Sequence, residues 1–324
     1  MAKDTQQNLL QRFQDAYTQY TGKYIRSIPS FKYSPPKNPV VLCHGLSGFD
    51  QLFFIPSIRH LTTLLQNHIH QIDDDSIFGD NGQLFAIDYW IGIKTLLESK
   101  GCQVFITKVP SFGSIELRSL ALHNLLEKLA LKSKTSQFNL IAHSMGGLDS
   151  RYLISNIPNK KNYEILSLTT ISTPHHGSEM ADFVVDQFES LKKIIPTTKE
   201  TYLPICFYQL TTNYMNEYFN KTVVDDPKVK YFSYGAMFTP NWYNVFKPSW
   251  QIINDKSKGK PNDGMVTVES SHWGTYLGTL YGLDHLDIIN WQNKLVAPSK
   301  TPIVNIDILQ FYLFITHNLG QRGF

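Results

Sequence analysis

The sequence predicts an α/β fold in which a mostly parallel central sheet carries helices on both faces. The sequence contains short, unbroken apolar runs that end in glycine, proline or polar turns. This pattern is typical of strands that are buried on both faces. Helical patterns lie between these runs, and this alternation is typical of parallel sheets. The chain has 324 residues, 42% hydrophobic and 18% charged, which is enough to surround one sheet with a large core.

Four apolar runs are expected to be strands: 40–43, 104–107, 138–142 and 165–171. Helical patterns occupy 89–99, 116–131 and 145–154. In the second of these helices, apolar residues repeat at spacings of three and four: Leu117, Leu120, Ala121, Leu125 and Leu129. Such spacing places them along one face of the helix, as in a helix packed on a core.

Residues 1–34 are mostly polar and are predicted to be an N-terminal extension of a single domain, 35–324. Two segments of that domain interrupt the alternation. Segment 53–83 contains acidic and glycine-rich turns, which are typical of a surface loop. Segment 179–227 carries apolar and aromatic residues on a broad helical face. It is either an ordinary helical insertion or a mobile cap over an apolar substrate site, and the residues support both interpretations.

Charge and cysteine content exclude several classes of function. The formal net charge is only +3 and no basic tract is interleaved with aromatic residues, so no nucleic-acid partner is expected. Cys43, Cys102 and Cys206 are odd in number and widely spaced, which favours buried thiols over disulfides or a metal knuckle. No apolar run approaches the roughly 20 residues of a membrane span, and the N-terminus lacks a secretory signal. Any membrane contact is therefore expected to be peripheral.

Ser144 is the candidate nucleophile. It follows an apolar strand and precedes a helical pattern, and a tight turn between such elements exposes its central side chain at the edge of the sheet. The turn needs small residues two before and two after the serine, and these are Ala142 and Gly146. Ala142 replaces the usual glycine, which is a mild departure. A serine hydroxyl also needs a base and an orienting acid, which follow it in the order acid, then histidine.

His285 is the best candidate base, because it lies in a loop just before an apolar helical run. His272 is its rival. Asp263, in an Asp-Gly turn between Ser144 and His285, is the candidate acid, and Asp284 is the alternative. A residue adjacent to the histidine rarely reaches the ring in the right geometry.

Acyl transfer also requires donors for an oxyanion. The N–H of Met145, directly after the nucleophile, is expected to be the first. The N–H of Leu46, in the loop after the strand at 40–43, is expected to be the second. These residues by themselves predict a serine ester hydrolase.

Six motifs in this order resemble the true lipases of Pseudomonas and Burkholderia, which have the α/β-hydrolase fold. They are His44–Gly48, Asp88–Gly92, Ala142–Gly147, Ser172–Ser178, Asn262–Gly264 and Asp284–Asp287. From about residue 35 to 324, the chain is still more similar to the yeast mitochondrial triacylglycerol lipases. The resemblance implies triacylglycerol lipase activity on acylglycerol at a lipid–water interface, a helical lid at about 179–227, and a mitochondrial location, or otherwise a cytoplasmic one. Contact with a membrane or lipid droplet is expected to be peripheral.

The same resemblance places the triad on Ser144, Asp263 and His285 and the oxyanion donors on Leu46 and Met145. It also exposes a departure. The bacterial enzymes hold a structural calcium, for which Asp287 matches one carboxylate ligand. The other ligand positions hold Lys247 and Trp291, which offer no carboxylate. We therefore expect no metal and no cofactor, and Lys247 is a candidate ion-pair partner of Asp287.

Other functions remain open on this scaffold. A phospholipase, a thioesterase or an acyltransferase would use the same triad. A catalytically inactive hydrolase that binds lipid is the alternative from another class, although all three triad residues and Gly45 are present.

Overall fold

The computed structural model describes residues 24–46, 89–133, 135–158, 160–194, 203–242, 244–291 and 306–324. In this part of the chain, seven strands form one sheet in the order β1-β7-β6-β5-β4-β2-β3, and each strand is parallel to its neighbours. The strands are β1 (Tyr24–Ile25), β2 (Val40–Cys43), β3 (Val104–Ile106), β4 (Gln137–His143), β5 (Glu164–Ile171), β6 (Lys230–Met237) and β7 (Thr275–Tyr281). The predicted parallel sheet is confirmed, and all four predicted strands belong to it.

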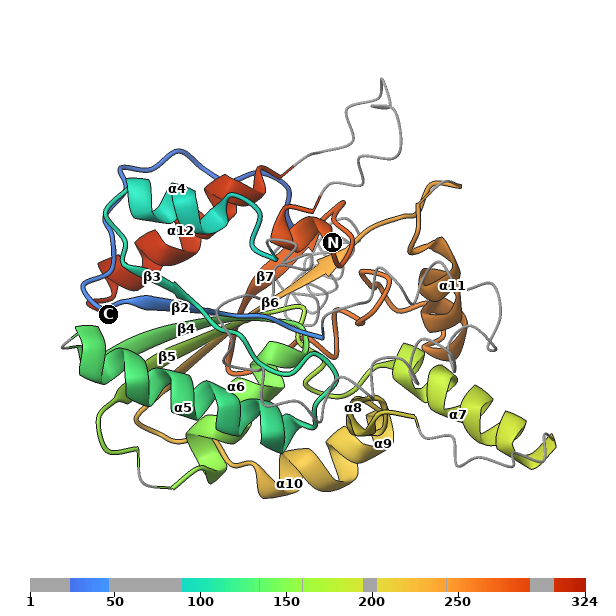
Figure 1. Ribbon diagram of the computed structural model, residues 1–324. Coiled ribbons are helices and arrows are strands. Elements are labelled where there is room, and N and C mark those ends of the chain that lie inside the picture. The colour runs from blue at the N-terminus through green and yellow to red at the C-terminus, as the bar shows by residue number, and fades with distance from the viewer. Residues whose placement is uncertain are drawn as a thin grey trace, which may run out of the picture.

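Helices cover both faces of the sheet (Figure 1). On one face, α4 (Ile93–Ser99) and α12 (Ile308–Gln321) share a core cluster with β2 and β6. On the other, α5 (Ile115–Ser133) and α6 (Met145–Asn156) pack against β2 and β4. The remaining described helices are α7 (Glu179–Ile194), α8 (Ile205–Gln209), α9 (Thr212–Tyr214), the π-helix η2 (Met215–Phe219), α10 (Asn220–Thr222), α11 (Lys247–Lys256) and the 3₁₀ helix η3 (Asp287–Ile289).

The first predicted helix begins later than its pattern suggested. Helix α4 starts at Ile93 rather than at residue 89, because Gly92 adopts the left-handed conformation, with φ 72°. Tyr89 and Trp90 precede this turn and point into the core instead of continuing a helix, and Trp90 is fully buried.

The packing face expected for α5 is wrong. Leu117 and Leu120 are each 48% exposed, whereas the buried stripe is Ile115, Arg118, Ser119, Leu122, Leu126 and Ala130. Both stripes repeat at three and four residues, so periodicity does not choose between them. The buried stripe packs Leu122, Leu126 and Ala130 in the core and also carries Arg118, whose ion pair is described below.

Packed structure begins before the expected domain boundary at residue 34. Strand β1 pairs with β7, and Ile28, Phe31 and Tyr33 pack on the core that α12 covers. The Ser34 N–H also donates to His317 Nδ1. Residues 24–34 therefore close one edge of the sheet and belong with the domain.

The helical insertion between β5 and β6 packs on the helix that follows Ser144. Its buried apolar residues, among them Cys206, Phe207 and Met215, share a cluster with Met145 and Leu148 of α6. All three cysteines are buried free thiols, as expected. The loop expected at 53–83 lies outside the described residues. No described helix is long and apolar enough to cross a membrane.

Candidate active site

Ser144 occupies a strained turn between β4 and α6. Its φ of 55° and ψ of −133° lie outside the regions that residues other than glycine normally adopt. Its backbone is held on both sides, because its N–H donates to Ile171 O at 3.0 Å and its carbonyl accepts from Thr173 Oγ1 at 2.8 Å. The turn predicted from the sequence is therefore present, with the serine at its most strained point.

Two glycines allow the chain to close around this turn. A Cβ on Gly146 would come within 2.6 Å of Cys43 O, so only glycine lets α6 start this close to the end of β2. A Cβ on Gly45 would come within 2.6 Å of Ser144 Cβ. The loop after β2 therefore lies directly against the serine, where an oxyanion loop is required.

Asp263 and His285 are paired, as predicted. His285 Nδ1 lies 2.8 Å from Asp263 Oδ2, and both side chains are almost fully buried. The second carboxylate oxygen of Asp263 accepts the N–H groups of Met265 at 2.9 Å and Val266 at 2.8 Å. Asp263 lies between β6 and β7 and His285 follows β7, so both come from the carboxyl ends of neighbouring strands.

The rival residues have other partners. His272 packs against Tyr276 with ring centroids 3.7 Å apart and ring planes tilted by 38°, and Asp263 pairs with His285 instead. Asp284 directs Oδ1 to the N–H groups of Leu286 and Asp287 and Oδ2 to Asn244 Nδ2. Asp284 thus shapes the loop that carries His285 and does not orient its ring.

His285 also lies beside the nucleophile turn. Its ring centroid is 4.5 Å from that of His143, the residue before Ser144. The hydrogen bonds of the described residues do not include one between Ser144 Oγ and His285. Such catalytic bonds are often long in free enzymes and tighten when substrate binds.

The two predicted oxyanion donors are available. Among the described residues, no hydrogen bond uses the N–H of Met145, in the first turn of α6, or that of Leu46. Both side chains are buried, in the same cluster. Free N–H groups at a helix start are suited to a developing negative charge.

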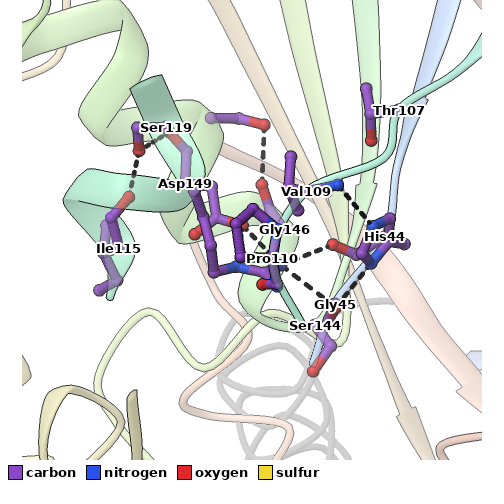
Figure 2. A network of polar contacts seen from close by, with 12 residues as sticks. His44, Gly45, Thr107, Val109, Pro110, Ile115, Ser119, Ser144, Gly146 and Asp149 are labelled. Carbon is purple, nitrogen blue, oxygen red and sulfur yellow. Dashed lines mark hydrogen bonds and ion pairs between the residues drawn. The ribbon is translucent and has the colours of Figure 1, made fainter. Parts of the chain in front are cut away.

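An unpredicted charge network holds the oxyanion loop. Arg118 is fully buried and pairs with Asp149, with Nη2 2.7 Å and Nε 2.9 Å from Oδ2. The same guanidinium donates to the carbonyls of His44 at 2.9 Å, Gly45 at 3.1 Å and Pro110 at 2.8 Å. Figure 2 shows the partners His44, Gly45, Pro110 and Asp149 on one side of Ser144. Arg118 lies three residues after Ile115 and four before Leu122, on the same helical face. A charged residue on this apolar face was the sequence signal that could have revealed the network.

The His44 ring completes this network in its neutral form. Its Nε2 accepts the N–H of Val109 at 3.2 Å, so Nδ1 carries the proton toward Gly45 O at 2.8 Å (Figure 2). Burial, and then the charge of Arg118, lower the pKa of His44 to about 4. The ring therefore keeps this hydrogen-bonding pattern at neutral pH.

The expected ion pair between Lys247 and Asp287 is wrong. Lys247 is exposed, and the described salt bridges do not include this pair. Asp287 Oδ2 instead accepts the N–H of Asp284 at 3.0 Å. Burial, and then the nearby Asp284 charge, raise the pKa of Asp287 to about 8. No cluster of three or more metal-binding side chains occurs among the described residues.

This arrangement belongs to one class of fold. A parallel sheet with a strained serine after its central strand, and an acid and a histidine after later strands, defines the α/β-hydrolases. Solved structures agree on the fold. The chain resembles lipase 1 from Pelosinus fermentans, with TM-score 0.55, 17% identity and coverage of 88% of this chain and 99% of that one. It also resembles a lipase of Bacillus licheniformis, with TM-score 0.52, 20% identity and coverage of 81% and 91%.

Sequence comparison identifies the family. A model described as palmitoyl protein thioesterase matches residues 39–242. Triacylglycerol lipase 2 of Saccharomyces cerevisiae is 56% identical over 310 residues, which are 90% of this chain and 94% of that protein. A triacylglycerol lipase of Vibrio cholerae is 26% identical over 84% of this chain and 85% of that one. The chain belongs to the palmitoyl protein thioesterase family and to the same family as the yeast lipase.

Proposed function

We propose that this enzyme hydrolyses the ester bonds of triacylglycerols, releasing fatty acid through an acyl-enzyme intermediate. The observation that carries the proposal is the 56% identity, over 90% of the chain, to a triacylglycerol lipase. The paired Asp263 and His285 and the strained Ser144 supply the chemistry that such a reaction needs.

The proposed reaction starts with the Asp263–His285 pair. Because Asp263 accepts the Nδ1–H of His285, Nε2 is left with the lone pair of a base. His285 removes the Ser144 hydroxyl proton as Ser144 Oγ attacks the ester carbonyl. The N–H groups of Leu46 and Met145 stabilise the oxyanion, and each such donor typically contributes about 10²- to 10³-fold to turnover.

The second half of the cycle repeats these roles. His285 gives its proton to the leaving alcohol oxygen, and the ester bond breaks. Water then attacks the acyl-Ser144 ester while His285 takes its proton. Collapse of this second intermediate returns the proton to Ser144 and releases the fatty acid.

A substrate panel tests the proposal. We expect emulsified triolein to be hydrolysed faster than phosphatidylcholine vesicles or palmitoyl-CoA. Ser144→Ala should lower kcat by on the order of 10⁶-fold, because it removes the nucleophile. Ser133→Ala, at the opposite end of α5 from Arg118, is the matched control and should retain full activity. Activity that survives Ser144→Ala would exclude the acyl-enzyme mechanism.

Thioester hydrolysis is a second candidate, because the matching family model is described as palmitoyl protein thioesterase. The same triad attacks a thioester carbonyl as readily as an ester. Faster turnover of palmitoyl-CoA than of triolein would make thioesters the main substrate class.

We further propose that the enzyme works at a lipid surface, in mitochondria. Exposed apolar side chains on the insertion, Ile205 and Tyr218, support peripheral contact with lipid. The proposed mitochondrial location rests on the resemblance of the sequence motifs alone. Fractionation of cells that express the tagged chain tests the location, and flotation with triolein-containing vesicles tests the lipid contact.

A further inference from the structure

A polar chain leads from the oxyanion loop to the proposed base. The Gly45 N–H donates to Tyr89 Oη at 3.0 Å, and Tyr89 Oη lies 2.7 Å from His143 Nδ1. The His143 ring in turn packs against the His285 ring, with centroids 4.5 Å apart. Segments after β2, before α4 and after β7 therefore meet around the last residue of β4.

The available donors and acceptors decide where the protons lie in this chain. Tyr89 has a single hydroxyl hydrogen, and its oxygen already accepts from Gly45. We assign the hydroxyl hydrogen to the contact with His143 Nδ1, which then acts as the acceptor. A neutral imidazole has one N–H, so the proton of His143 lies on Nε2.

His143 is a fully buried histidine whose ring faces His285. Burial, and then the nearby His285 charge, hold the pKa of His143 well below its usual range. A hydrogen bond with the His285 backbone raises the pKa of His143, but burial outweighs that effect. The ring is therefore neutral at physiological pH.

We propose that Tyr89 and His143 are positioning residues that couple the oxyanion loop to His285 during ester hydrolysis. The inference rests on the proposed function, because it takes His285 as the base. Tyr89 holds the Gly45 peptide against Ser144. The same hydroxyl fixes the uncharged His143 ring beside the His285 ring. Neutrality matters because His285 becomes cationic when it takes the Ser144 proton. A second cation in ring contact would oppose that step.

A double-mutant cycle of Tyr89→Phe and His143→Phe tests the coupling. The measurements are kcat and KM for soluble p-nitrophenyl butyrate, together with the melting temperature. We expect each single variant to lose about tenfold in kcat, with KM within about twofold. The double variant should fall no more than about twofold below the weaker single variant, because both changes interrupt the same chain. Losses that multiply, or that appear mainly in KM, overturn the proposal.

The pH profile adds a readout that a merely structural role would not move. The acid limb of kcat/KM reports protonation of the base. Without the Tyr89 hydroxyl, neutral His143 loses the donor that stabilises it, so its protonation becomes less unfavourable. A cationic His143 in ring contact opposes protonation of His285, so we expect the limb to move to lower pH in Tyr89→Phe and to stay in place when the same change is made in the His143→Phe background. A limb that stays in place in both backgrounds, or moves equally in both, contradicts the coupling.

Two further variants keep the test decisive. Tyr163→Phe removes a hydroxyl that lies 2.8 Å from His123 Nδ1, the same contact on the other face of the sheet, and should leave kcat unchanged. His143→Asn offers an amide oxygen where Nδ1 lies and should keep more activity than His143→Phe. Equal losses in His143→Asn and His143→Phe overturn the proposal even if Tyr89→Phe does not fold. If only the coupling fails, Ser144→Ala is still inactive, whereas it is active if the assignment of Ser144 and His285, on which the inference rests, fails.

Discussion

Buried charged groups lie on both sides of Ser144, near the oxyanion loop and near the base His285, and the two sets have different partners. On the oxyanion side, Arg118 is paired with Asp149, and backbone carbonyls take its remaining donors. On the base side, Asp284 and Asp287 lie together, and the described salt bridges give neither of them a cation. Their oxygens are satisfied by Asn244 and by backbone N–H groups.

The difference is visible in the pKa values of the buried carboxyl groups. Burial raises the pKa of Asp149 to about 6, and the Arg118 charge opposes this shift. On the base side, burial raises the pKa of Asp284, and burial and the Asp284 charge raise the pKa of Asp287 to about 8. The loop that carries His285 therefore holds the carboxyl group that titrates at the higher pH.

The largest expected effect separates the roles of the two aspartates on the base side. Asp263→Asn places an amide N–H against His285 Nδ1, which favours the wrong tautomer, and kcat should fall by on the order of 10⁴-fold. Asp284→Asn is the matched control, because Asp284 bonds the loop backbone and Asn244 instead. It should lose far less. Steady-state kinetics of both variants decide the assignment, and equal losses would contradict it.

The second effect concerns stability on the oxyanion side. Arg118→Met leaves the buried Asp149 unpaired, which should cost about 3–5 kcal/mol in the free energy of unfolding, measured with urea. The double change Arg118→Met with Asp149→Leu should recover part of this loss, since it also removes the stranded charge. The loss in the free energy of unfolding that the double change does not recover reports the contacts of Arg118 with the carbonyls of His44, Gly45 and Pro110. Full additivity of the two single changes would argue against the pair.

The third effect is smaller and depends on pH. The pKa of Asp287 is about 8 in the folded protein, well above its ordinary value near 3.8. Between these values the unfolded chain releases a proton that the folded protein keeps, so this carboxyl costs stability as pH rises toward 8. Asp287→Asn should therefore stabilise the protein more at pH 8 than at pH 5, by up to about 4 kcal/mol in urea denaturation. An equal effect at both pH values would contradict the raised pKa.

The smallest expected effect is that of chelation. Asp287 bonds the Asp284 backbone, and the positions that supply calcium ligands in bacterial relatives hold Lys247 and Trp291 here. We expect hydrolysis of triolein to be unchanged, within about twofold, by excess EDTA. A large loss that added calcium restores would place a metal in the loop beside His285.

Much of the fold could be predicted, because strands buried on both faces are continuous apolar runs. The runs at 40–43, 138–142 and 165–171 fall within β2, β4 and β5. The nucleophile turn could also be predicted, because the crowding at Gly146 permits no larger side chain there. The buried face of α5 and the starting point of the packed domain could not be predicted, because both depend on distant segments that approach in space.

The sequence by itself determined the local elements of this site: Ser144 after its strand, His285 in its loop, and the glycines that let chains approach. Local spacing suffices there, because strand, turn and helix preferences act between near neighbours. Only the tertiary structure decided which charges are buried together. Arg118 meets Asp149 and the His44 carbonyl, and Tyr89 meets His143, across 31, 74 and 54 residues of chain. Desolvation and pairing act through space, so the spacing of Arg118 can show that a charge faces the core but cannot identify its partner.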